Sequence, residues 1–471
     1  MTSFTQHPES INTLITAFDV PKGIAAKGVT TIITWIHDNY KDKETLFSQC
    51  LLNLKFPSSK SSVRTIGIFY PRLYEGGVEK VISQQIPMFL RMGFKVVLFT
   101  EVIDTAREYP IPDSVMRVVL PRNYDKRPQA FAKALILNAV DLLILHSASS
   151  RNLVFDVILA KSYNIPVVVT RHELTSSPLF ELKVKSVFNL PHVYLLCDAL
   201  IVLSRMEETF YQNMGVNAIY VPNPIEPAPT VGDNNQEFVR DQDIVLWIGR
   251  LDAAVKNYRD ALEIMKNLVN KRPNTLCYIV GGEFTRGSVS EVKRYIQRNN
   301  LSKSVFWYDH TLDVAPFYQK AKIHLVTSRM ESFSMMIAES KAFGIPMVNF
   351  SLPYLELLGD QKGYVSIPQG DIDGATDAIT EILDNPEKWK RLSDEALESI
   401  QTFTQFNLAE KWESIIQDIE SFCGSRTFTE KCRLNLLFWE TMMGHLSEGK
   451  KATSWRNKII SRLKEVTRRF I

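Results

Sequence analysis

Two basic residues in the middle of the chain have the types and the spacing to hold a negatively charged group. Arg250 ends the apolar run "DIVLWIGR", which is typical of a strand, and Lys256 follows six residues later, where a helical pattern begins. A planar guanidinium and a compact ammonium near a helix start suit a pyrophosphate. The alternative is a pair of solvated surface cations, which this segment alone would favour.

Two carboxylates lie further along the chain. In "ESFSMMIAE", Glu331 comes just before a helical pattern and Glu339 lies two turns inside it, in an otherwise apolar helix. Glu331, near the amide-rich helix start, could accept hydrogen bonds from sugar hydroxyls, and Glu339 could take both hydroxyls of a ribose. The alternative is that a Glu near a helix start complements the helix dipole and caps amides without any ligand.

Two adjacent glycines form a third candidate site. Gly76 and Gly77 follow the apolar run "TIGIFY" and precede a segment with helical periodicity. Because glycine has no side chain, backbone amides there can approach a ligand closely, and the helix start adds unpaired N–H groups that suit an anion. A plain strand-to-helix turn is the alternative. The spacing departs from the G-x-G-x-x-G fingerprint, which argues against a nicotinamide enzyme.

The elements that would position these residues alternate between strand and helix from residue 65 onward. Short β-branched runs are separated by longer segments with a 3.6-residue period, such as "NLVFDVILAKSYN". The expected strands are "TIGIFY", "FKVVLFT", "DLLILHS", "IPVVVTRH" and "ALIVLS", followed by "DIVLWIGR", "LCYIVGG", "SVFWYDH", "IHLVTS", "IPMVNFS" and "GYVSIP". Between the two sets, residues 222–242 are polar and rich in proline, which indicates a linker.

This pattern predicts an α/β protein with two Rossmann-like domains that face each other across a cleft, where ligands bind at the carboxyl ends of the strands. The expected parts are an N-terminal extension of unknown role over residues 1–62, a first domain over 63–225, a second domain over 226–405, a helix that crosses back over 406–424 and a basic amphipathic tail over 425–471. Within the extension, "KGVTTIITWIHDNY" fits a strand or a helix.

Composition excludes several classes of protein. The chain has 471 residues, of which 45% are hydrophobic and 23% charged, and this suits two ordinary cores. Its five cysteines lack the close pairing of a zinc site or a redox motif, and they are few for a disulfide-stapled secreted chain. No run of 18 apolar residues predicts a membrane span. We therefore expect a cytoplasmic protein.

The last residues of the chain concentrate positive charge. Residues 444–471 carry eight Lys and Arg residues against two Glu, although the whole chain has a net charge of only +3. In the segment from Trp455 to Ile471, apolar residues recur every three or four positions and basic residues fill the rest. Such a helix could lie on an anionic membrane, or pack on the first domain or on a protein partner. Nucleic acid is not expected, because no binding module accompanies the charge.

Four motifs in combination resemble one enzyme family. They are "GGVE" after the first strand, "PNPIE" at the hinge, "GR" with a lysine six residues after the arginine, and the paired glutamates of "ESFSMMIAE". Together they are similar to the retaining nucleotide-sugar glycosyltransferases of family four, group 1, which have the GT-B fold. The resemblance covers roughly residues 63–422.

The resemblance implies a role for each candidate residue. Arg250 and Lys256 would neutralise the diphosphate as the glycosidic bond breaks, and Glu331 would meet the donor sugar. His172, which ends "IPVVVTRH", matches a family histidine that faces this sugar, and His146 at a neighbouring strand end is a weaker candidate. The residues expected to bind the donor are Gly76, Gly77, Asn223, Ser334 and Glu339.

Two positions depart from the family pattern. Ser334 stands where many members have Gly, and Asn257 replaces the Gly that often follows the lysine. Neither change removes a charge that the chemistry needs. They therefore bear on which donor sugar is used rather than on whether the chain is active.

The reaction implied is transfer of a hexose from a nucleoside-diphosphate sugar, with UDP-sugars favoured, to a glycan or lipid-linked acceptor with retention of configuration. The first domain would carry the acceptor and the second the donor, in cell-surface polysaccharide or lipid-linked glycan synthesis, on the cytoplasmic face of the membrane if the tail binds there. Neither a metal nor another cofactor is expected. The acidic "DQD" at 241–243 falls in the linker, and "DID" at 371–373 falls at a helix start, where Asp is common.

Two other functions remain open for such a chain. One is a non-catalytic GT-B module that serves as partner or co-chaperone of another glycosyltransferase, and the other is a nucleotide-sugar epimerase. Both cations, Arg250 and Lys256, and both carboxylates, Glu331 and Glu339, are present. A pure scaffold would not need all four, so the set favours the enzyme.

Overall fold

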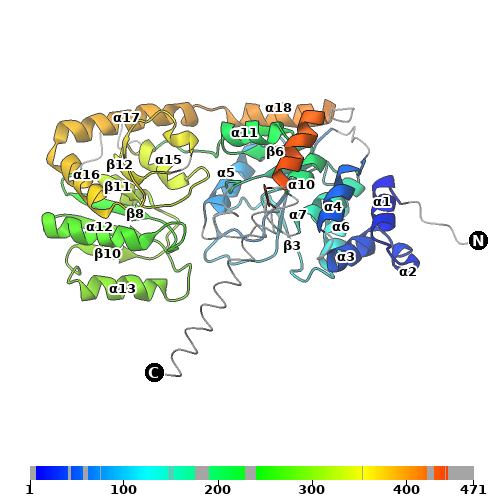
Figure 1. Ribbon diagram of the computed structural model, residues 1–471, viewed down its shortest axis with the longest axis horizontal. Coiled ribbons are helices and arrows are strands. Elements are labelled where there is room, and N and C mark those ends of the chain that lie inside the picture. Colours follow the sequence, from blue (N-terminus) through cyan, green and yellow to red (C-terminus); the bar gives the residue numbers. More distant parts are fainter. Residues whose placement is uncertain are drawn as a thin grey trace, which may run out of the picture.

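The computed structural model describes residues 7–40, 44–56, 62–74, 76–147, 150, 152–175, 190–228, 240–352, 354–421, 429–440 and 442–443. They form two lobes that lie side by side, each built around one parallel β-sheet with helices packed against it (Figure 1). This arrangement confirms the predicted fold class of two Rossmann-like domains.

The first lobe contains a seven-stranded sheet in the order β3-β2-β1-β4-β5-β6-β7, and all of its pairs are parallel. The central strand β1 is buried along its whole length, with Ile66 opposite Val96 on one side and Leu142 on the other. Burial on both faces is typical of parallel sheets covered by helices. The strands are β1 (Thr65–Phe69), β2 (Lys95–Thr100), β3 (Met116–Val119), β4 (Leu142–Leu145), β5 (Val167–Thr170), β6 (Ala199–Val202) and β7 (Ala218–Tyr220).

Two separate apolar cores cover the faces of this sheet. Ile66 and Ile68 of β1 belong to one core, whereas Phe69 at the end of the same strand belongs to the other, as expected for side chains that alternate between faces. The helices of the first lobe are α5 (Gly77–Arg91), α6 (Arg127–Leu137), α7 (Leu153–Ser162), α10 (Leu190–Leu196) and α11 (Arg205–Gln212).

The N-terminal extension is helical and joins the first lobe (Figure 1). It comprises α1 (Glu9–Ala17), α2 (Lys22–Ala25), α3 (Val29–Asn39) and α4 (Glu44–Leu52). The segment that fitted either a strand or a helix is α3, whose Ile32, Ile33 and Ile36 are buried together at helical spacing. Because α3 packs on α6 and α7, it belongs to the core of the lobe.

The second lobe repeats the same strand order with six parallel strands, β10-β9-β8-β11-β12-β13. They are β8 (Ile244–Ile248), β9 (Leu276–Val280), β10 (Val305–Tyr308), β11 (Ile323–Val326), β12 (Met347–Phe350) and β13 (Tyr364–Ile367). Its helices are α12 (Tyr258–Lys271), α13 (Ser288–Arg298), α14 (Ala315–Lys320), α15 (Met335–Ala342), the 3-10 helix η1 (Glu356–Leu358), α16 (Ile372–Asp384) and α17 (Pro386–Thr404).

The chain then returns to the first lobe through α18 (Leu408–Ser421), which lies along it in Figure 1. Trp412 and Ile416 of α18 are buried in the same core as Phe89 of α5, and the Trp412 and Phe89 rings meet edge to face at 5.2 Å. The backbone N–H of Val63 also donates a hydrogen bond to Glu420 at 2.6 Å. The second lobe is therefore joined to the first by two chain segments, one on each side of it in sequence.

A further helix covers residues 430–440, within the segment predicted as a basic tail. Its Leu436 and Trp439 are buried in the core of the first lobe, and Trp439 meets Phe210 of α11 at 5.9 Å. The beginning of the predicted tail is thus a helix docked on the lobe through its apolar residues. The basic amphipathic stretch from Trp455 to Ile471 lies outside the described residues.

All of the predicted strand runs contain a strand, but two strands had no counterpart in the prediction. Both β3 and β7 are edge strands of the first sheet, with four and three residues. Met116 and Val119 of β3 are about half exposed, so this strand lacks the continuous apolar run of a buried one. In the described part of the chain, no helix combines the length and the apolar character needed to cross a membrane.

Candidate functional site

The two sheets place most of the candidate residues at equivalent points. In each sheet the strand order reverses direction between two central strands, β1 and β4 in the first and β8 and β11 in the second. Crevices at the carboxyl ends of such strands are the usual ligand sites of doubly wound sheets. Gly76 and His146 follow β1 and β4, and Arg250 and Glu331 follow β8 and β11.

Lys256 and Glu331 are brought together in the second lobe. The ammonium of Lys256 donates a hydrogen bond to Oε1 of Glu331 at 2.6 Å, and both side chains are largely buried. Thr327, just after β11, fixes the backbone beneath this pair, because its hydroxyl donates to the carbonyls of Lys256 and Asn257, each at 3.0 Å. The indole of Trp247 donates in turn to the Thr327 hydroxyl. The cation is therefore held on a rigid turn between two strand ends.

Asn257 has a backbone conformation that favours glycine. Its backbone adopts a left-handed conformation with φ of 55°, which glycine and asparagine tolerate better than other residues. Its side-chain amide donates to Asp260 at 2.7 Å in the first turn of α12. The replacement of glycine by asparagine thus preserves the geometry of the turn that carries Lys256.

Arg250 remains accessible at the end of β8. Its guanidinium lies 4.4 Å from the ring centroid of Phe284 and makes only long contacts, of 3.3 and 3.4 Å, with Asp252. The side chain is about half exposed, so most of its hydrogen-bonding capacity is available. Burial raises the pKa of Glu79 in the first lobe, and the charge of Arg250 is among the smaller effects that oppose this rise. Arg250 is therefore close enough to the first lobe for its charge to act on Glu79.

A close backbone approach positions Arg250. A Cβ on Gly281, just after β9, would lie 1.9 Å from the carbonyl oxygen of Gly249, so no other residue fits at this position. The Gly249 N–H donates to the Val280 carbonyl at 3.0 Å, which continues the sheet up to Arg250. Sequence analysis did not single out Gly281, although "IVGG" at the end of a strand was a visible signal.

The start of α15 carries Ser334 and Glu339. Ser334 is the N-cap residue and has a left-handed backbone with φ of 67°, which accounts for the glycine of many family members. Its hydroxyl is buried and has no hydrogen-bond partner among the described residues. Because α15 begins at Met335, Glu339 lies just over one turn inside the helix, and the expectation of two turns was wrong. The turn formed by Ser332 and Phe333 precedes the helix.

Glu339 contacts both lobes. Its Oε1 accepts a hydrogen bond from Lys80 of α5 at 2.5 Å, and its Oε2 accepts one from the hydroxyl of Tyr318 at 3.0 Å. Neither partner was predicted. Lys80 directly follows "GGVE", so its position was a usable signal, whereas nothing in the sequence marks Tyr318.

A carboxylate of the chain itself lies against the glycine turn before α5. Glu79 occupies the third position of the helix and reaches back to the N-cap residue Gly76, where an added Cβ would lie 2.2 Å from Oε2 of Glu79. Burial raises the pKa of Glu79, while the nearby charges of Arg72 and Arg250 act in the opposite direction. Gly77 faces the second lobe, since its Cβ would lie 3.6 Å from Cγ of Met335. A phosphate at this turn would therefore share it with Glu79.

The two histidines form a pair at the ends of β4 and β5. Nδ1 of His146 lies 2.8 Å from Nε2 of His172, and the rings stack with centroids 5.1 Å apart. Burial lowers the pKa of His172 to about 3 and that of His146 well below its ordinary value. Both rings are consequently neutral at physiological pH. The backbone carbonyl of His172 accepts a hydrogen bond from the Ser332 hydroxyl of the other lobe at 2.5 Å.

Asn223 is the predicted residue with the weakest structural link to the others. It is buried in the linker that follows β7. Within the described ranges, no hydrogen bond joins its amide to any other candidate residue. Its neighbour Ile225 packs against a core that includes Phe333 and Met336 near the start of α15, so the linker passes close to that part of the site.

Asp243 and Asp371, which belong to the acidic sequences "DQD" and "DID", have structural partners. Asp243 lies 2.8 Å from Arg272 and 2.9 Å from Lys322, and Asp371 caps α16 by accepting the N–H of Gly374 at 2.9 Å. Across the residues that the structure describes, His, Cys, Asp and Glu form no group of three or more that could hold a metal ion.

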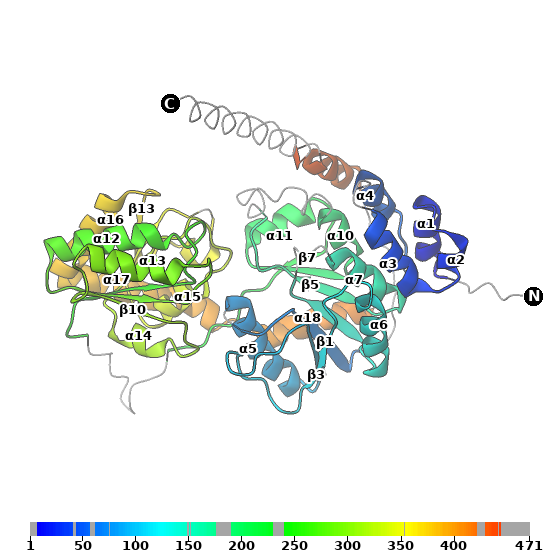
Figure 2. The same ribbon diagram turned by 90° about the horizontal axis from the view of Figure 1, so that it is seen from below.

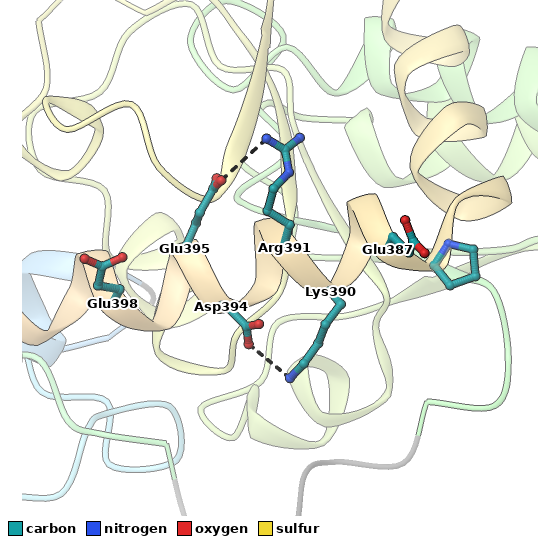
Figure 3. Close-up of a pocket in the computed structure, with 7 residues that line it drawn as sticks. Glu387, Lys390, Arg391, Asp394, Glu395 and Glu398 are labelled. Atoms are coloured by element: carbon teal, nitrogen blue, oxygen red, sulfur yellow. Dashed lines mark ion pairs between the residues drawn. The ribbon is translucent and has the colours of Figure 1, made fainter.

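A surface hollow of about 640 Å³ lies elsewhere, along α17 (Figure 3). Its charged residues pair along the helix, Lys390 with Asp394 at 3.0 Å and Arg391 with Glu395 at 3.8 Å. Pairs at this spacing are typical of a solvated helix face. None of the candidate residues lines the hollow, so it is separate from the interlobe site.

Each lobe matches one family of glycosyltransferases. Residues 75–228 match Glycosyltransferase Family 4, and residues 233–399 match Glycosyl transferases group 1. The two matches together cover well over half of the chain. They include all of the candidate residues, from Gly76 to Asn223 in the first and from Arg250 to Glu339 in the second.

Two curated relatives are bacterial glycosyltransferases. An uncharacterized glycosyltransferase of Haemophilus influenzae is 25% identical over 226 residues, which are 47% of this chain and 61% of the relative. The amylovoran biosynthesis glycosyltransferase AmsD of Erwinia amylovora is 24% identical over 229 residues, 47% of this chain and 63% of that protein. The chain thus spans less than two thirds of the length of these relatives.

A solved structure shares the fold. HepE of Anabaena, crystallised in complex with UDP, is 16% identical and superposes with a TM-score of 0.58 over 74% of this chain and 100% of HepE. Three observations support the same assignment: the two parallel sheets, the helix α18 that returns to the first lobe, and the two family matches. The chain belongs to the group 1 glycosyltransferases and has their GT-B fold.

Proposed function

We propose that this chain transfers a hexose from a nucleoside-diphosphate sugar to an acceptor hydroxyl, with retention of configuration. The observation that carries the proposal is the pairing of Lys256 with Glu331 beside the start of α15, with Arg250 at the neighbouring strand end. The cations that a diphosphate requires thus lie next to a carboxylate that can accept hydrogen bonds from sugar hydroxyls. HepE, with the same fold, was solved with UDP, and this favours a UDP-sugar as donor.

The two cations would act on the leaving group. When the bond between the anomeric carbon and the β-phosphate oxygen breaks, negative charge grows on the diphosphate and positive charge on the sugar. Preorganised donors aimed at such a charge supply roughly 3 to 4 kcal/mol each in other enzymes. An ammonium has three N–H donors, so Lys256 can keep one on Glu331 and offer the others to phosphate oxygens.

The carboxylate and the histidines would hold the sugar. Oε1 of Glu331 is engaged with Lys256, which leaves Oε2 for a sugar hydroxyl. His172 is neutral, so it can exchange hydrogen bonds with the sugar without adding a charge. His146, paired with it at 2.8 Å, would fix the orientation of the His172 ring.

Retention is proposed through attack on the face that the diphosphate leaves. The acceptor oxygen forms the new bond to the anomeric carbon as the bond to the β-phosphate oxygen breaks, and the acceptor proton passes to that phosphate oxygen. The leaving diphosphate is thus the base, and no enzyme carboxylate is bonded to the sugar. Arg250 and Lys256 stabilise the charge until the proton has transferred.

We place the acceptor among glycans or lipid-linked glycans of a bacterial surface, because the relative AmsD is named for polysaccharide biosynthesis. A membrane contact at the cytoplasmic face fits this acceptor. The helix over residues 430–440 exposes Leu434, Leu437 and Phe438 on the side away from its buried residues, and each of them is more than half exposed. This apolar face precedes the basic residues 444–471 in the sequence, a combination that suits an anionic lipid surface.

Incubation of the purified chain with radiolabelled nucleotide sugars and a membrane extract tests the proposal. Transfer of label to a glycan or lipid fraction, with release of the nucleoside diphosphate, is the expected result. The anomeric coupling in the NMR spectrum of the product reports retention or inversion. If no donor gave either transfer of label or release of nucleotide, the enzyme proposal would be wrong, and a non-catalytic binding module would remain.

A further inference from the structure

Lys80 of the first lobe reaches into the second. Its N–H bonds to the carbonyl of Gly76 at 3.3 Å in the first turn of α5, and its ammonium lies 2.5 Å from Oε1 of Glu339 in α15. The side chains of Lys80 and Glu339 are 23% and 18% exposed. Figure 2 shows α5 on the side of the first lobe that faces α15. The ion pair therefore joins the two lobes.

Tyr318 holds the other oxygen of the same carboxylate. Its hydroxyl lies 3.0 Å from Oε2 of Glu339 and is fully buried. Burial and the charge of Glu339 raise the pKa of Tyr318 well above its ordinary value, so the hydroxyl stays protonated and donates. The two oxygens of Glu339 thus have different partners, one in its own lobe and one across the cleft.

The neighbouring contacts keep the starts of α5 and α15 close to each other. A Cβ on Gly77 would lie in van der Waals contact with Met335, at 3.6 Å. Ser332 donates to the backbone of His172 across the cleft. Burial and then the charge of Glu339 raise the pKa of Tyr109, in the first lobe, to about 12. The charge of the Glu339 carboxylate therefore acts on groups of both lobes.

These contacts conflict with the role expected for Glu339 from the sequence, which is to hold both hydroxyls of a ribose. The following inference rests on the proposed function, in which the donor is a nucleoside-diphosphate sugar. A ribose diol that donates to both carboxylate oxygens needs Oε1, and Lys80 already occupies it. We propose that Lys80 is a further residue of the nucleotide subsite, whose ammonium competes with the ribose diol for Oε1 of Glu339. Binding of the nucleotide then requires this interlobe pair to break.

The competition has a consequence for the reaction cycle. After transfer, the pair between Lys80 and Glu339 can form again, and it then competes with the hydrogen bonds from the ribose of the product to Glu339. Lys80 thereby favours release of the nucleoside diphosphate, a step that limits turnover in many enzymes. A cation at this position tunes affinity for the ribose without contacting the base.

The test compares nucleotides with and without the diol. The affinities of UDP, ADP and GDP, and of their 2′,3′-dideoxy counterparts, are measured by calorimetry with the wild-type chain and the Lys80→Met variant. Removing the competitor should raise the preference for ribose over dideoxyribose by about fivefold, the scale expected for a partly buried ion pair. In a Glu339→Gln background, the same Lys80→Met change should leave the preference unaltered.

A matched control is available in the first lobe. Lys161 pairs with Asp198 at 2.9 Å, with side chains 12% and 22% exposed, on elements that do not border the cleft. Lys161→Met should leave the ribose preference at the wild-type value.

An unchanged or lowered preference in Lys80→Met would overturn the inference alone. Failure of the wild-type chain to bind any ribonucleoside diphosphate would overturn the proposed function, and this inference with it. Melting temperatures of all variants, measured in the same buffer, exclude loss of folding as the cause of either result.

Discussion

The ammonium of Lys256 and Oε1 of Glu331 share a hydrogen bond of 2.6 Å, although the two residues are 75 positions apart in the sequence. Both are largely buried, so removal of either leaves the other as an unpaired charge. The leaving-group and sugar contacts proposed for this pair are therefore coupled rather than independent.

Coupling predicts non-additive losses. Lys256→Met and Glu331→Gln should each lower kcat by about 10²- to 10³-fold, as loss of one preorganised group does elsewhere. The double variant should lose less than the product of the two single losses, because each single change already disturbs the partner. Steady-state transfer rates of the four proteins measure this, and strictly multiplicative losses would show that the two residues act separately.

Arg250 is predicted to matter through its charge on the leaving group. Arg250→Met should lower kcat/KM by about 10²-fold or more. Arg259 offers a matched control, since it is a more exposed arginine of α12 that pairs with Glu291 of α13. Arg259→Met should retain the wild-type rate. Equal rates for all three proteins would remove Arg250 from the mechanism.

Ser334 is predicted to lower the stability of the chain while it supplies a hydroxyl group to the site. Its left-handed backbone is unfavourable for any residue with a Cβ, so Ser334→Gly should stabilise the chain by about 1 kcal/mol. Its buried hydroxyl would be lost with the change. Urea unfolding reports the stability, and KM for the nucleotide sugar reports the hydroxyl. A destabilised variant would mean that the hydroxyl has a structural partner.

Stability should depend on pH through His324. This ring is buried beside Lys256, and burial followed by the charge of that lysine lowers the pKa of His324 to about 3. In the unfolded chain the pKa is about 6.5, so below that pH the unfolded state binds the proton first. The neutral His324 ring makes its full contribution to the free energy of unfolding above about pH 6.5. Below that pH, the free energy of unfolding falls by up to about 1.4 kcal/mol per pH unit toward pH 3 because of this residue.

The His324→Leu variant isolates this effect. Its unfolding free energy should fall less steeply than that of the wild type between about pH 6.5 and about pH 5. Urea denaturation at several pH values measures both slopes. Parallel curves would show that the histidine takes up a proton without unfolding.

The sequence predicted those parts of the site that depend on local geometry. Asn257 and Ser334 were recognised as replacements of glycine, and both have a left-handed backbone in the structure. Arg250 and Glu331 were placed at strand ends because apolar runs mark buried parallel strands clearly. Strand ends are marked by a few neighbouring residues, so one sequence is enough to read them, whereas the two glycine replacements were recognised through the family resemblance.

Contacts between the lobes could not be read in the same way. The pair of Lys80 with Glu339 joins residues 259 positions apart, and it exists only because α5 and α15 meet across the cleft. Tyr318 lies in a short helix with no motif. The edge strand β3 was missed because a strand paired on one side needs fewer apolar residues, and β7 was missed because it has only three residues.

The most direct test of the central claim is a titration of the wild-type chain and the Lys256→Met variant with UDP, ADP or GDP and with the matching nucleoside. The account predicts that the wild type binds one of these diphosphates at least about tenfold more tightly than the variant, since a charge-assisted contact is worth more than 1.4 kcal/mol. The nucleoside should bind both proteins equally. Equal affinity of the two proteins for the diphosphate, or no binding of any of the three, would contradict it.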